Sequence, residues 1–383
     1  SDLLHRNFAG CRVLFQIWHD LRLRIRKCYG FDKSVILNDY RAVGNVLDFG
    51  ADATGATSSS SAFAAALAAY TTVYIPQGQY KLTTTLTVAR KKLIGDGPEA
   101  VTLTYTGSSS AINASGTDAQ NCHLEGFKLV GTASASAGIL ISEASVGCRR
   151  GIFKNIYVTG FTGSGAFGVD LAASLNNGIY YNYFERVDCI ANDYGFRVYS
   201  SDGATNGYRC NSNTFVSCDA SQNVSGNGVR VDYGSGNTFV GLNCESNGAA
   251  GVYLGYTYET TFCGGFSENN TAALNVSANA VRVHYYGRRT IDSIVGTTNS
   301  ASSFFTTDDF TVDASGNIAA TSIATSAELP IQNTVAKIYA GGSTPNGRIT
   351  ASPGSLFLYT GGGASTTLWV KESGTGDVGW VAK

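Results

Sequence analysis

The pattern of hydrophobic and polar positions divides the chain into regions of different character. Between residues 93 and 285, short runs in which apolar and polar residues alternate are separated by clusters of Gly, Ser, Thr and Asn. Alternation with a period of two indicates a β-strand with one buried face, and the clusters are typical of turns. The middle of the chain is therefore predicted to consist of many short strands joined by tight turns.

Two ladders of similar segments repeat within this middle region. The first is built on phenylalanines spaced 31, 24 and 23 residues apart: Phe184, Phe215, Phe239 and Phe262. The second runs out of phase with the first, and each of its segments opens with Gly: Gly138, Gly168, Gly195, Gly228 and Gly251. Self-similarity at a period of about 20–50 residues predicts a solenoid. Each repeat is then one turn of a coil, and the strands of successive turns stack about 4.8 Å apart along its axis.

Alternation along each strand predicts which side chains point into the coil. The four phenylalanines face inward as an aromatic stack, and Cys189 and Cys244 lie further along the strands as small core residues. An Asn precedes three of the phenylalanines by two positions, and we expect these amides to stack at a corner: Asn182, Asn213 and Asn237. In the Gly ladder, the outward position between the two inward ones is occupied, turn by turn, by Leu140, Asp170, Arg197, Arg230 and Tyr253.

The region before the repeats has a different order of elements. Asn45-Val-Leu-Asp-Phe-Gly-Ala-Asp52 leads into an Ala-rich helix that ends near Tyr70 and is expected to be capped by Ser. Val73-Tyr-Ile-Pro-Gln-Gly-Gln-Tyr80 then predicts a strand that closes in a Pro-Gly turn. This order and spacing resemble the opening of the pectate-lyase-like superfamily. The resemblance implies an all-β chain folded as a right-handed parallel β-helix.

The end of the chain carries a second resemblance. Phe310-Thr-Val-Asp-Ala-Ser-Gly-Asn-Ile-Ala-Ala-Thr321 resembles the strand-turn units of interwound tail-fibre trimers. Residues 345–383 contain two hairpin-like strand runs with polar Gly turns, and they resemble the small C-terminal β domain of phage tail fibres and tailspikes. These resemblances imply a homotrimer in the virion tail that is assembled in the host cytoplasm and binds bacterial surface polysaccharide.

Together the patterns and resemblances predict five regions. They are an N-terminal assembly or virion-anchoring segment (1–34), a capping strand-helix-strand region (35–92), the parallel β-helix (93–300), a trimeric strand-turn connector (301–336) and a small C-terminal β domain (337–383).

The first 34 residues are rich in bulky apolar and basic side chains. Leu21 to Arg26 alternates with the period of a strand. Apolar residues before it recur at helical spacing, at Leu4, Phe8, Cys11, Phe15 and Trp18. One interpretation is a basic amphipathic helix on a membrane surface. The other, which we prefer, is a segment that docks onto sister chains or onto other tail or baseplate proteins of the virion.

Composition argues against several classes of protein. A net charge of −1 argues against a nucleic-acid binder, since phosphate recognition needs a positive surface. Nine Cys residues, an odd number without a C-x-x-C pair, predict free buried thiols rather than a disulfide framework. No apolar run of about 18 residues exists to span a membrane. His123 and His284 are far apart in the sequence and indicate no zinc site, so neither a metal nor another cofactor is expected.

Two pairs of carboxyl groups are predicted to stand on adjacent turns. Asp188 and Asp219 each follow a ladder phenylalanine by four residues, and Glu245 and Glu268 each follow one by six. Outward side chains on adjacent turns are about 5 Å apart, close to the carboxyl separation of retaining glycosidases. Either pair could then hold one raised and one ordinary pKa, as catalysis by a general acid and base requires. The alternative is a solvated polar face without chemistry.

The outward ladder of Asp170, Arg197, Arg230 and Tyr253 combines charge with an aromatic ring. This arrangement is suited to holding an acidic sugar by bidentate hydrogen bonds and ring contact. Its alternative is an Asp–Arg ion pair that only spaces out a surface. We expect the glycan to lie in a groove on the coil between turns that bear both this ladder and the aspartate pair.

Three functions remain open from the sequence. The first is a phage tailspike or tail fibre subunit that binds bacterial surface polysaccharide during host attachment, with or without depolymerising it. The second is a non-catalytic structural or receptor-binding fibre, which the lack of a known catalytic signature favours. The third is a secreted polysaccharide lyase or glycosidase, which would not need the C-terminal region.

Overall fold

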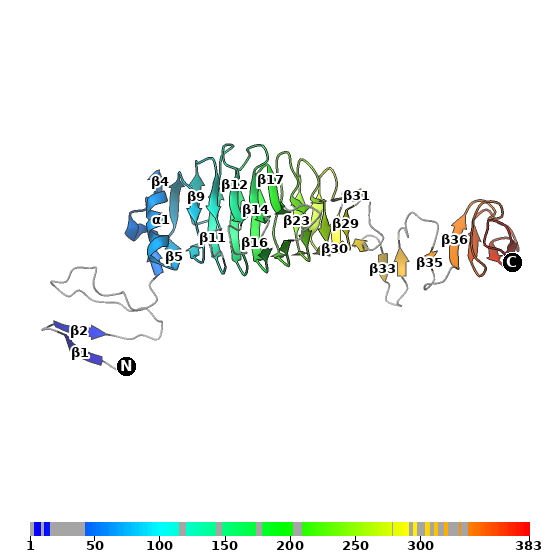
Figure 1. Cartoon of the computed structure of the whole chain (residues 1–383), viewed down its shortest axis with the longest axis horizontal. Helices are drawn as coiled ribbons and strands as arrows, with labels where there is room; N and C mark the ends of the chain where they lie inside the picture. Colours follow the sequence, from blue (N-terminus) through cyan, green and yellow to red (C-terminus); the bar gives the residue numbers. More distant parts are fainter. Residues whose placement is uncertain are drawn as a thin grey trace. The chain divides into compact units, whose positions relative to one another are not determined.

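The computed structural model of the chain contains two compact units, Ser1–Thr306 and Thr307–Lys383 (Figure 1). The structure describes residues 43–114, 120–142, 148–173, 178–201, 209–277, 279–290 and 336–383, together with the strands outside these ranges whose bounds are given below.

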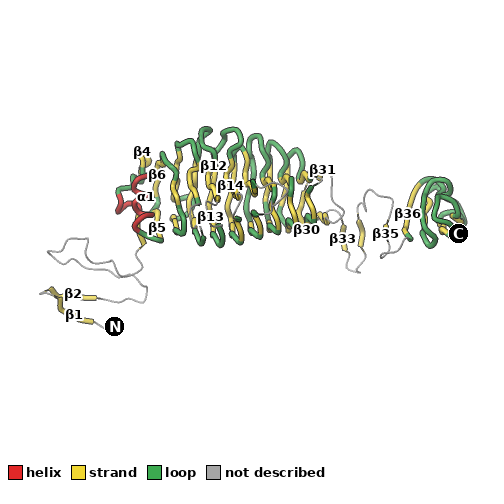
Figure 2. The backbone as a smooth tube through the Cα atoms, viewed as in Figure 1, coloured by secondary structure: helices red, strands yellow, loops and turns green. Residues whose placement is uncertain are grey.

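The first unit is a parallel β-helix (Figures 1 and 2). In the described part of this unit, three sheets wrap the coil, with nine, sixteen and five strands. Each sheet is built by pairing a strand of one turn in parallel with the corresponding strand of the next turn, as β14 pairs with β17 and β13 with β16. The predicted parallel β-helix is therefore confirmed.

The nine-stranded sheet contains β7 (Leu86–Thr87), β10 (Ser110–Asn113), β12 (Ala137–Ser142), β14 (Phe167–Ala173), β17 (Tyr194–Ser200), β20 (Val229–Asp232), β24 (Val252–Leu254), β28 (Leu274–Val276) and β31 (Ile294–Gly296). The five-stranded sheet of the coil contains β15 (Ile179–Tyr180), β18 (Cys210–Asn211), β21 (Gly234–Ser235), β25 (Thr257–Tyr258) and β29 (Ala280–Val281). The sixteen-stranded sheet contains β3 (Val43–Asn45), β4 (Thr54–Ser58), β5 (Thr72–Ile75), β6 (Gly78–Leu82), β8 (Lys92–Gly95), β9 (Val101–Tyr105), β11 (His123–Val130), β13 (Ile152–Thr159), β16 (Tyr183–Ile190), β19 (Thr214–Val216), β22 (Thr238–Val240), β23 (Asn243–Glu245), β26 (Thr261–Cys263), β27 (Phe266–Glu268), β30 (His284–Thr290) and β32 (Ser303–Thr306).

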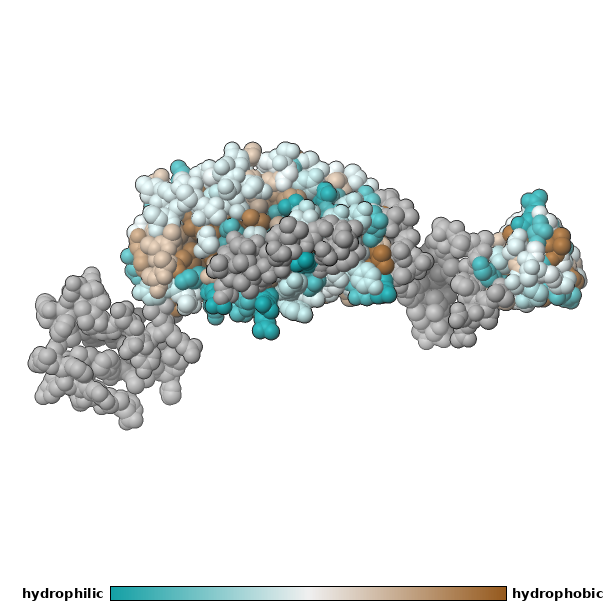
Figure 3. All heavy atoms as spheres, viewed as in Figure 1, coloured by the Kyte–Doolittle hydropathy of each residue, from teal (hydrophilic) through white to brown (hydrophobic). Residues whose placement is uncertain are grey.

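The outer surface of the coil mixes polar and apolar residues. On the face shown in Figure 3, hydrophilic residues gather along the lower edge of the β-helix, and hydrophobic residues form smaller patches above them. Among the residues that the structure describes, no helix is long and apolar enough to cross a membrane.

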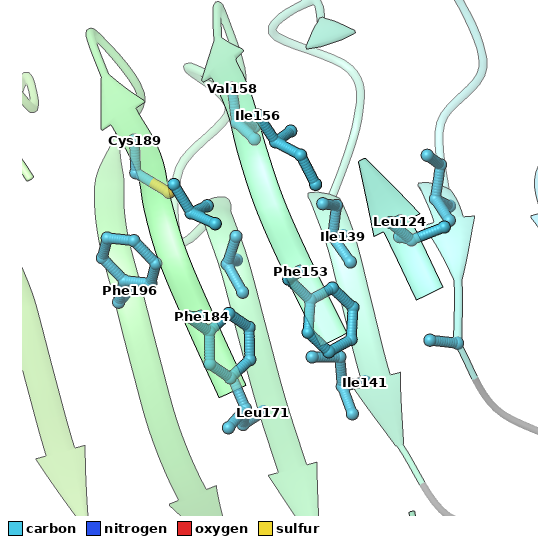
Figure 4. Packing of buried hydrophobic residues seen from close by; sticks show 14 of the residues in the cluster. Leu124, Ile139, Ile141, Phe153, Ile156, Val158, Leu171, Phe184, Cys189 and Phe196 are labelled. Atoms are coloured by element: carbon cyan, nitrogen blue, oxygen red, sulfur yellow. The ribbon is translucent and has the colours of Figure 1, made fainter. Parts of the chain in front are cut away.

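Stacked phenylalanine rings fill the inside of the coil. Successive ring centroids are 4.6, 4.5, 4.4 and 4.7 Å apart along the series Phe153, Phe184, Phe215, Phe239 and Phe262. Figure 4 shows Phe153 and Phe184 side by side, with Ile141 and Leu171 of the nine-stranded sheet next to them. The predicted aromatic stack is confirmed, and it begins one turn earlier than predicted. Cys189 and Cys244 are buried, as expected for small core residues.

Two ladders of asparagine amides close corners of the coil. In the predicted ladder, the side-chain amide of Asn182 donates to Asn213 Oδ1 at 2.9 Å, and that of Asn213 donates to Asn237 Oδ1 at 3.0 Å. The same oxygens accept backbone N–H groups, so the ladder satisfies buried turn backbone. A second ladder, which was not predicted, is formed by Asn192, Asn223, Asn247 and Asn270.

A residue in the left-handed backbone region bends each turn of the sixteen-stranded sheet. These residues have φ between 49° and 76° and are Gly126, Asn155, Arg186, Ser217, Gly241 and Gly264. In β16 the alternation of inward and outward residues slips by one position at Arg186. The bend therefore divides the sheet into a part that carries the phenylalanine stack and a part that carries Asp188.

A short cap covers the first end of the coil (Figure 2). It contains the 3-10 helix η1 (Val46–Phe49) and the helix α1 (Ser60–Ala69), which buries Phe63 and Leu67 in the core. Ser59 stands at the N-cap position, but its hydroxyl exchanges hydrogen bonds with the backbone of Asp52. A serine therefore stands at the N-cap as predicted, but it makes no side-chain capping hydrogen bond, because its hydroxyl ties the preceding loop to the helix start.

The N-terminal segment contains two strands, β1 (Leu4–Phe8) and β2 (Cys11–Phe15), which pair antiparallel. The helical spacing of its apolar residues therefore gave the wrong element here. Periodicity over so few residues does not separate helix from strand, and the hairpin pairs its backbone groups locally. Trp18 and the predicted strand at 21–26 lie outside the described residues.

The second unit contains a hairpin and a small sheet. The hairpin is formed by β33 (Phe310–Val312) and β34 (Ile318–Ala320). The sheet contains β35 (Leu329–Pro330), β36 (Lys337–Gly341), β37 (Leu356–Tyr359), β38 (Leu368–Lys371) and β39 (Trp380–Ala382). The buried ring of Trp380 packs edge-on against Phe357 at 6.0 Å and Tyr339 at 5.9 Å. The strand runs expected beyond residue 345 are present as β37, β38 and β39.

Replacing Phe215 by Ala is expected to destabilise the coil by about 3–5 kcal/mol, because it leaves a cavity in the middle of the ring stack. The matched control is Val224→Ala, at a side chain that is 62% exposed, which should change the free energy of unfolding by less than about 0.5 kcal/mol. Urea denaturation followed by far-UV circular dichroism measures both. If both variants lowered the free energy of unfolding by the same amount, the ring stack would not be a main source of stability.

Candidate active site

One row of outward side chains runs along the part of the sixteen-stranded sheet that follows the bend. Strand pairing places its members on successive turns in the order Thr102, Lys128, Tyr157, Asp188, Asp219 and Asn243, which we call the carboxylate row. Because parallel strands stack in register, neighbouring members are about 4.8 Å apart at the backbone. The register predicted for Asp188 and Asp219 is therefore present.

The two aspartates of the carboxylate row have different surroundings. Burial, and then the charge of Asp219, raise the pKa of Asp188 from 3.8 to about 6. The carboxylate of Asp219 accepts hydrogen bonds from the Ser221 hydroxyl and from the Asn243 amide, the latter at 3.1 Å. The carboxyl group of Asp188 therefore keeps its proton up to about pH 6, whereas the carboxylate of Asp219 accepts two hydrogen bonds. Neighbouring carboxyl groups in unlike environments are a common basis for dividing acid and base roles.

Two further residues extend the row on the other side of Asp188. Tyr157 is paired directly with Asp188, and burial, followed by the charges of both aspartates, raises the pKa of its phenol. Its hydroxyl therefore keeps its proton and is able to donate a hydrogen bond. The Lys128 ammonium lies 5.0 Å from the centroid of the Tyr157 ring. Neither residue was predicted from the sequence, although Phe153, 31 positions before Phe184, places Tyr157 in register.

Glu245 and Glu268 also stand on adjacent turns, since β23 pairs with β27 at these two residues. The backbone N–H of Glu245 donates to the Ser221 oxygen at 3.0 Å, and the same hydroxyl donates to Asp219. The glutamate pair therefore begins two residues beyond the carboxylate row on the same sheet.

The outward ladder predicted on the nine-stranded sheet is present, with Asp170, Arg197, Arg230 and Tyr253 paired on successive turns. Arg197 donates to both carboxylate oxygens of Asp170, at 2.8 and 2.7 Å, and thereby covers an aspartate that is only 6% exposed. Its guanidinium carbon lies 4.3 Å from the ring centroid of Phe167 and 4.7 Å from that of Tyr199. The guanidinium of Arg197 therefore bonds Asp170 and contacts two aromatic rings.

Arg230 is held differently from Arg197. Its Nε donates to Asp232, and its guanidinium carbon lies 5.3 Å from the ring centroid of Tyr253. The side chain is 38% exposed, compared with 26% for Arg197. Arg230 is therefore the more accessible of the two arginines.

The predicted site residues fall into two sets on different sheets. The carboxylate row and the glutamate pair lie on the sixteen-stranded sheet, whereas Arg197 and Arg230 lie on the nine-stranded sheet. The turn 191–193 separates the two strands within one turn of the coil. They therefore form two candidate surfaces on different sheets, and the groove expected to join them stays a prediction.

No metal centre is evident in the described ranges, which contain no group of three or more His, Cys, Asp and Glu residues that could hold an ion.

Comparisons with known proteins agree with this architecture. Residues 43–136 match the family described as rhamnogalacturonase A/epimerase, pectate lyase-like. No match was found among curated protein sequences. The gp42 tailspike of Acinetobacter phage vb_AbaP_AS12 is similar in structure over 82% of this chain and 70% of its own, with 12% identity and a TM-score of 0.50.

Pre-mature gene product 12 of bacteriophage phi29 is similar over 64% of this chain, with 14% identity and a TM-score of 0.51. The match spans only 36% of that phage protein. Identities this low show a shared fold and nothing more specific. The chain is therefore a parallel β-helix protein with a pectate-lyase-like region at residues 43–136 and the fold that these two phage proteins share.

Proposed function

We propose that the chain is a subunit of a phage tailspike or tail fibre that binds bacterial surface polysaccharide and hydrolyses it at Asp188 and Asp219. The observation that carries the proposal is the carboxylate row, in which these two groups stand on adjacent turns and the pKa of Asp188 is raised to about 6. Two carboxyl groups with unlike environments at this spacing are what glycosidic cleavage uses.

In the proposed reaction, Asp188 is the general acid. It protonates the glycosidic oxygen as the bond to the anomeric carbon breaks, and the ionised Asp219 attacks that carbon to form a glycosyl ester. Asp188, now ionised, then removes a proton from the water molecule that hydrolyses the ester, which restores both groups. The Ser221 and Asn243 donors hold Asp219 in place for the attack.

The backbone spacing of the two strands supports this route over direct attack by water. Adjacent strands are about 4.8 Å apart, near the roughly 5–5.5 Å between the carboxyl groups of retaining enzymes. Inverting enzymes need about 6.5–9.5 Å to admit a water molecule between sugar and base. Tyr157, one turn away, supplies a hydrogen-bond donor for a neighbouring sugar hydroxyl.

The phage assignment is supported by the fold shared with the two phage proteins and by the resemblance of residues 345–383 to tail-fibre domains. The proposal includes the assembly: the chain forms a homotrimer in the virion tail, and its residues 1–34 dock onto other tail or baseplate proteins. Glycan release would then accompany attachment of the phage to its host.

A second candidate is a receptor-binding fibre without catalysis. It is favoured by the second surface, where Arg230 and Tyr253 offer binding groups on a sheet separate from the carboxylate row.

Asp188→Asn and Asp219→Asn are each expected to lower the release of new reducing ends from a cleaved polysaccharide by about 10²–10⁴-fold, because each removes one of the two reacting carboxyl groups. A panel of capsular and O-antigen polysaccharides from candidate hosts provides the substrates. Glu268→Gln is the matched control on the same sheet and should keep at least about half of the rate, within the effect of an ordinary surface change. Loss of activity in Glu268→Gln, with both aspartate variants active, would move the site to the glutamate pair.

The rate of cleavage is expected to fall as pH rises through about 6. Asp188 must be protonated to act as the acid, and its pKa is raised to about 6. The measurement is kcat/KM for one polysaccharide between pH 4 and 9. A rate that increased steadily across this range would contradict the acid role of Asp188.

A further inference from the structure

A cluster of partly exposed tyrosines lies on and beside the nine-stranded sheet. The rings of Tyr233 and Tyr256 stack with centroids 4.7 Å apart and an interplanar angle of 12°, and Tyr199 meets Tyr233 edge-on at 6.5 Å. We call the group formed by Tyr199, Tyr233, Tyr253, Tyr256, Arg230 and Asp232 the tyrosine patch. None of its members belongs to the carboxylate row, which lies on the other large sheet.

Strand pairing explains why these residues meet. Tyr199 on β17 is paired with Asp232 on β20, and Arg230 on β20 is paired with Tyr253 on β24. Tyr233 directly follows β20, and its backbone N–H donates to the carbonyl of Tyr256 on the next turn. Three successive turns of the coil therefore contribute rings to one patch. The guanidinium carbon of Arg197 lies 4.7 Å from the ring centroid of Tyr199.

Arg230 and Asp232 place a donor and an acceptor next to these rings. Arg230 uses Nε to reach Asp232, and in the described part of the chain its two terminal NH₂ groups show no hydrogen-bond partner. Guanidinium NH₂ groups and carboxylate oxygens are the side-chain groups best able to bond several hydroxyls at once.

The chemistry of the tyrosine patch fits an uncharged sugar. A sugar ring has a face of C–H groups that packs on an aromatic ring and a rim of hydroxyls that needs donors and acceptors. Arg197 is neutralised by Asp170, and Arg230 by Asp232. The charges around the rings therefore cancel, and nothing in the patch calls for the acidic sugar that the sequence alone suggested.

We propose that the tyrosine patch is a second carbohydrate site, which holds uncharged sugar units of the polysaccharide without cleaving them. This inference rests on the proposed function, because it takes a bacterial surface polysaccharide as the ligand. The patch would keep the polymer on the coil while the carboxylate row acts on another part of it.

The test uses the full chain carrying Asp188→Asn, so that binding is measured without cleavage. Tyr233→Leu and Tyr256→Leu are added together, and dissociation constants for the panel of capsular and O-antigen polysaccharides are measured by affinity electrophoresis. We expect binding of at least one panel member to weaken at least about tenfold, as loss of roughly 1.4 kcal/mol or more of ring contact implies. Tyr181→Leu is the matched control, because this tyrosine is 63% exposed and, like Tyr233, has a positive φ. This variant should bind as the parent does.

A conservative pair, Tyr233→Phe with Tyr256→Phe, keeps the rings and should restore most of the binding, which separates ring contact from a folding defect. Equal affinity in the Leu pair and in the Tyr181 control would overturn the proposal. So would binding restricted to acidic polysaccharides and lost at high salt, because an uncharged ligand is insensitive to screening.

The failure of this inference is distinguishable from failure of the proposed function. If the otherwise wild-type chain cleaves short oligosaccharides equally well with and without the Leu pair, while the pair lowers affinity for the polymer, both proposals stand. If the chain cleaves nothing but the Leu pair still weakens binding, hydrolysis fails and the tyrosine patch stands. Cleavage with unchanged polymer binding would overturn the patch alone.

Discussion

Parallel pairing of each turn with the next, in register, is the constraint on which the rest of the structure depends. It places each side chain directly above its counterpart, so the inside must be filled by groups that stack on themselves. Phenylalanine rings 4.4–4.7 Å apart and bonded asparagine amides meet this requirement. Buried amides are satisfied only while the register holds, so the ladders penalise a slip of one residue. On the outside the same register arranges unlike side chains into rows along the axis.

The sequence predicts these rows correctly where a repeated residue, such as a stacked phenylalanine, shows how successive turns align. Without such a residue, the row cannot be read from the sequence. Asp188 and Asp219 were placed correctly because each follows a stacked phenylalanine by four residues, with the bend between them repeated on both turns. Tyr157 was missed because the turn of Phe153 was not aligned. Tyr233 and Tyr256 stand after strand ends, where alternation no longer sets direction. The burial of Asp170 under Arg197 and the raised pKa of Asp188 depend on three-dimensional packing, which spacing alone does not contain.

The division of polar groups between two sheets gives the coil two kinds of surface. On the sixteen-stranded sheet, two carboxyl groups stand on adjacent turns, and burial, followed by the charge of Asp219, raises the pKa of Asp188 to about 6. On the nine-stranded sheet, each arginine is matched with an aspartate, and the rings lie beside the neutralised pairs. A buried carboxyl group without a counter-charge lowers the stability of the fold, and such groups are common at catalytic sites. Ion pairs beside aromatic rings instead suit binding. Our two proposals therefore place cleavage and binding of one polymer on separate faces of the coil.

We propose Asp188 as the acid and Asp219 as the nucleophile of a retaining glycosidase, because the two residues are paired on adjacent turns. The most direct measurement is proton NMR of the anomeric centre in the first oligosaccharide released by the wild-type chain from a polysaccharide that it cleaves. We expect the anomeric configuration to be retained. Inversion, or an unsaturated product formed by elimination, would contradict it.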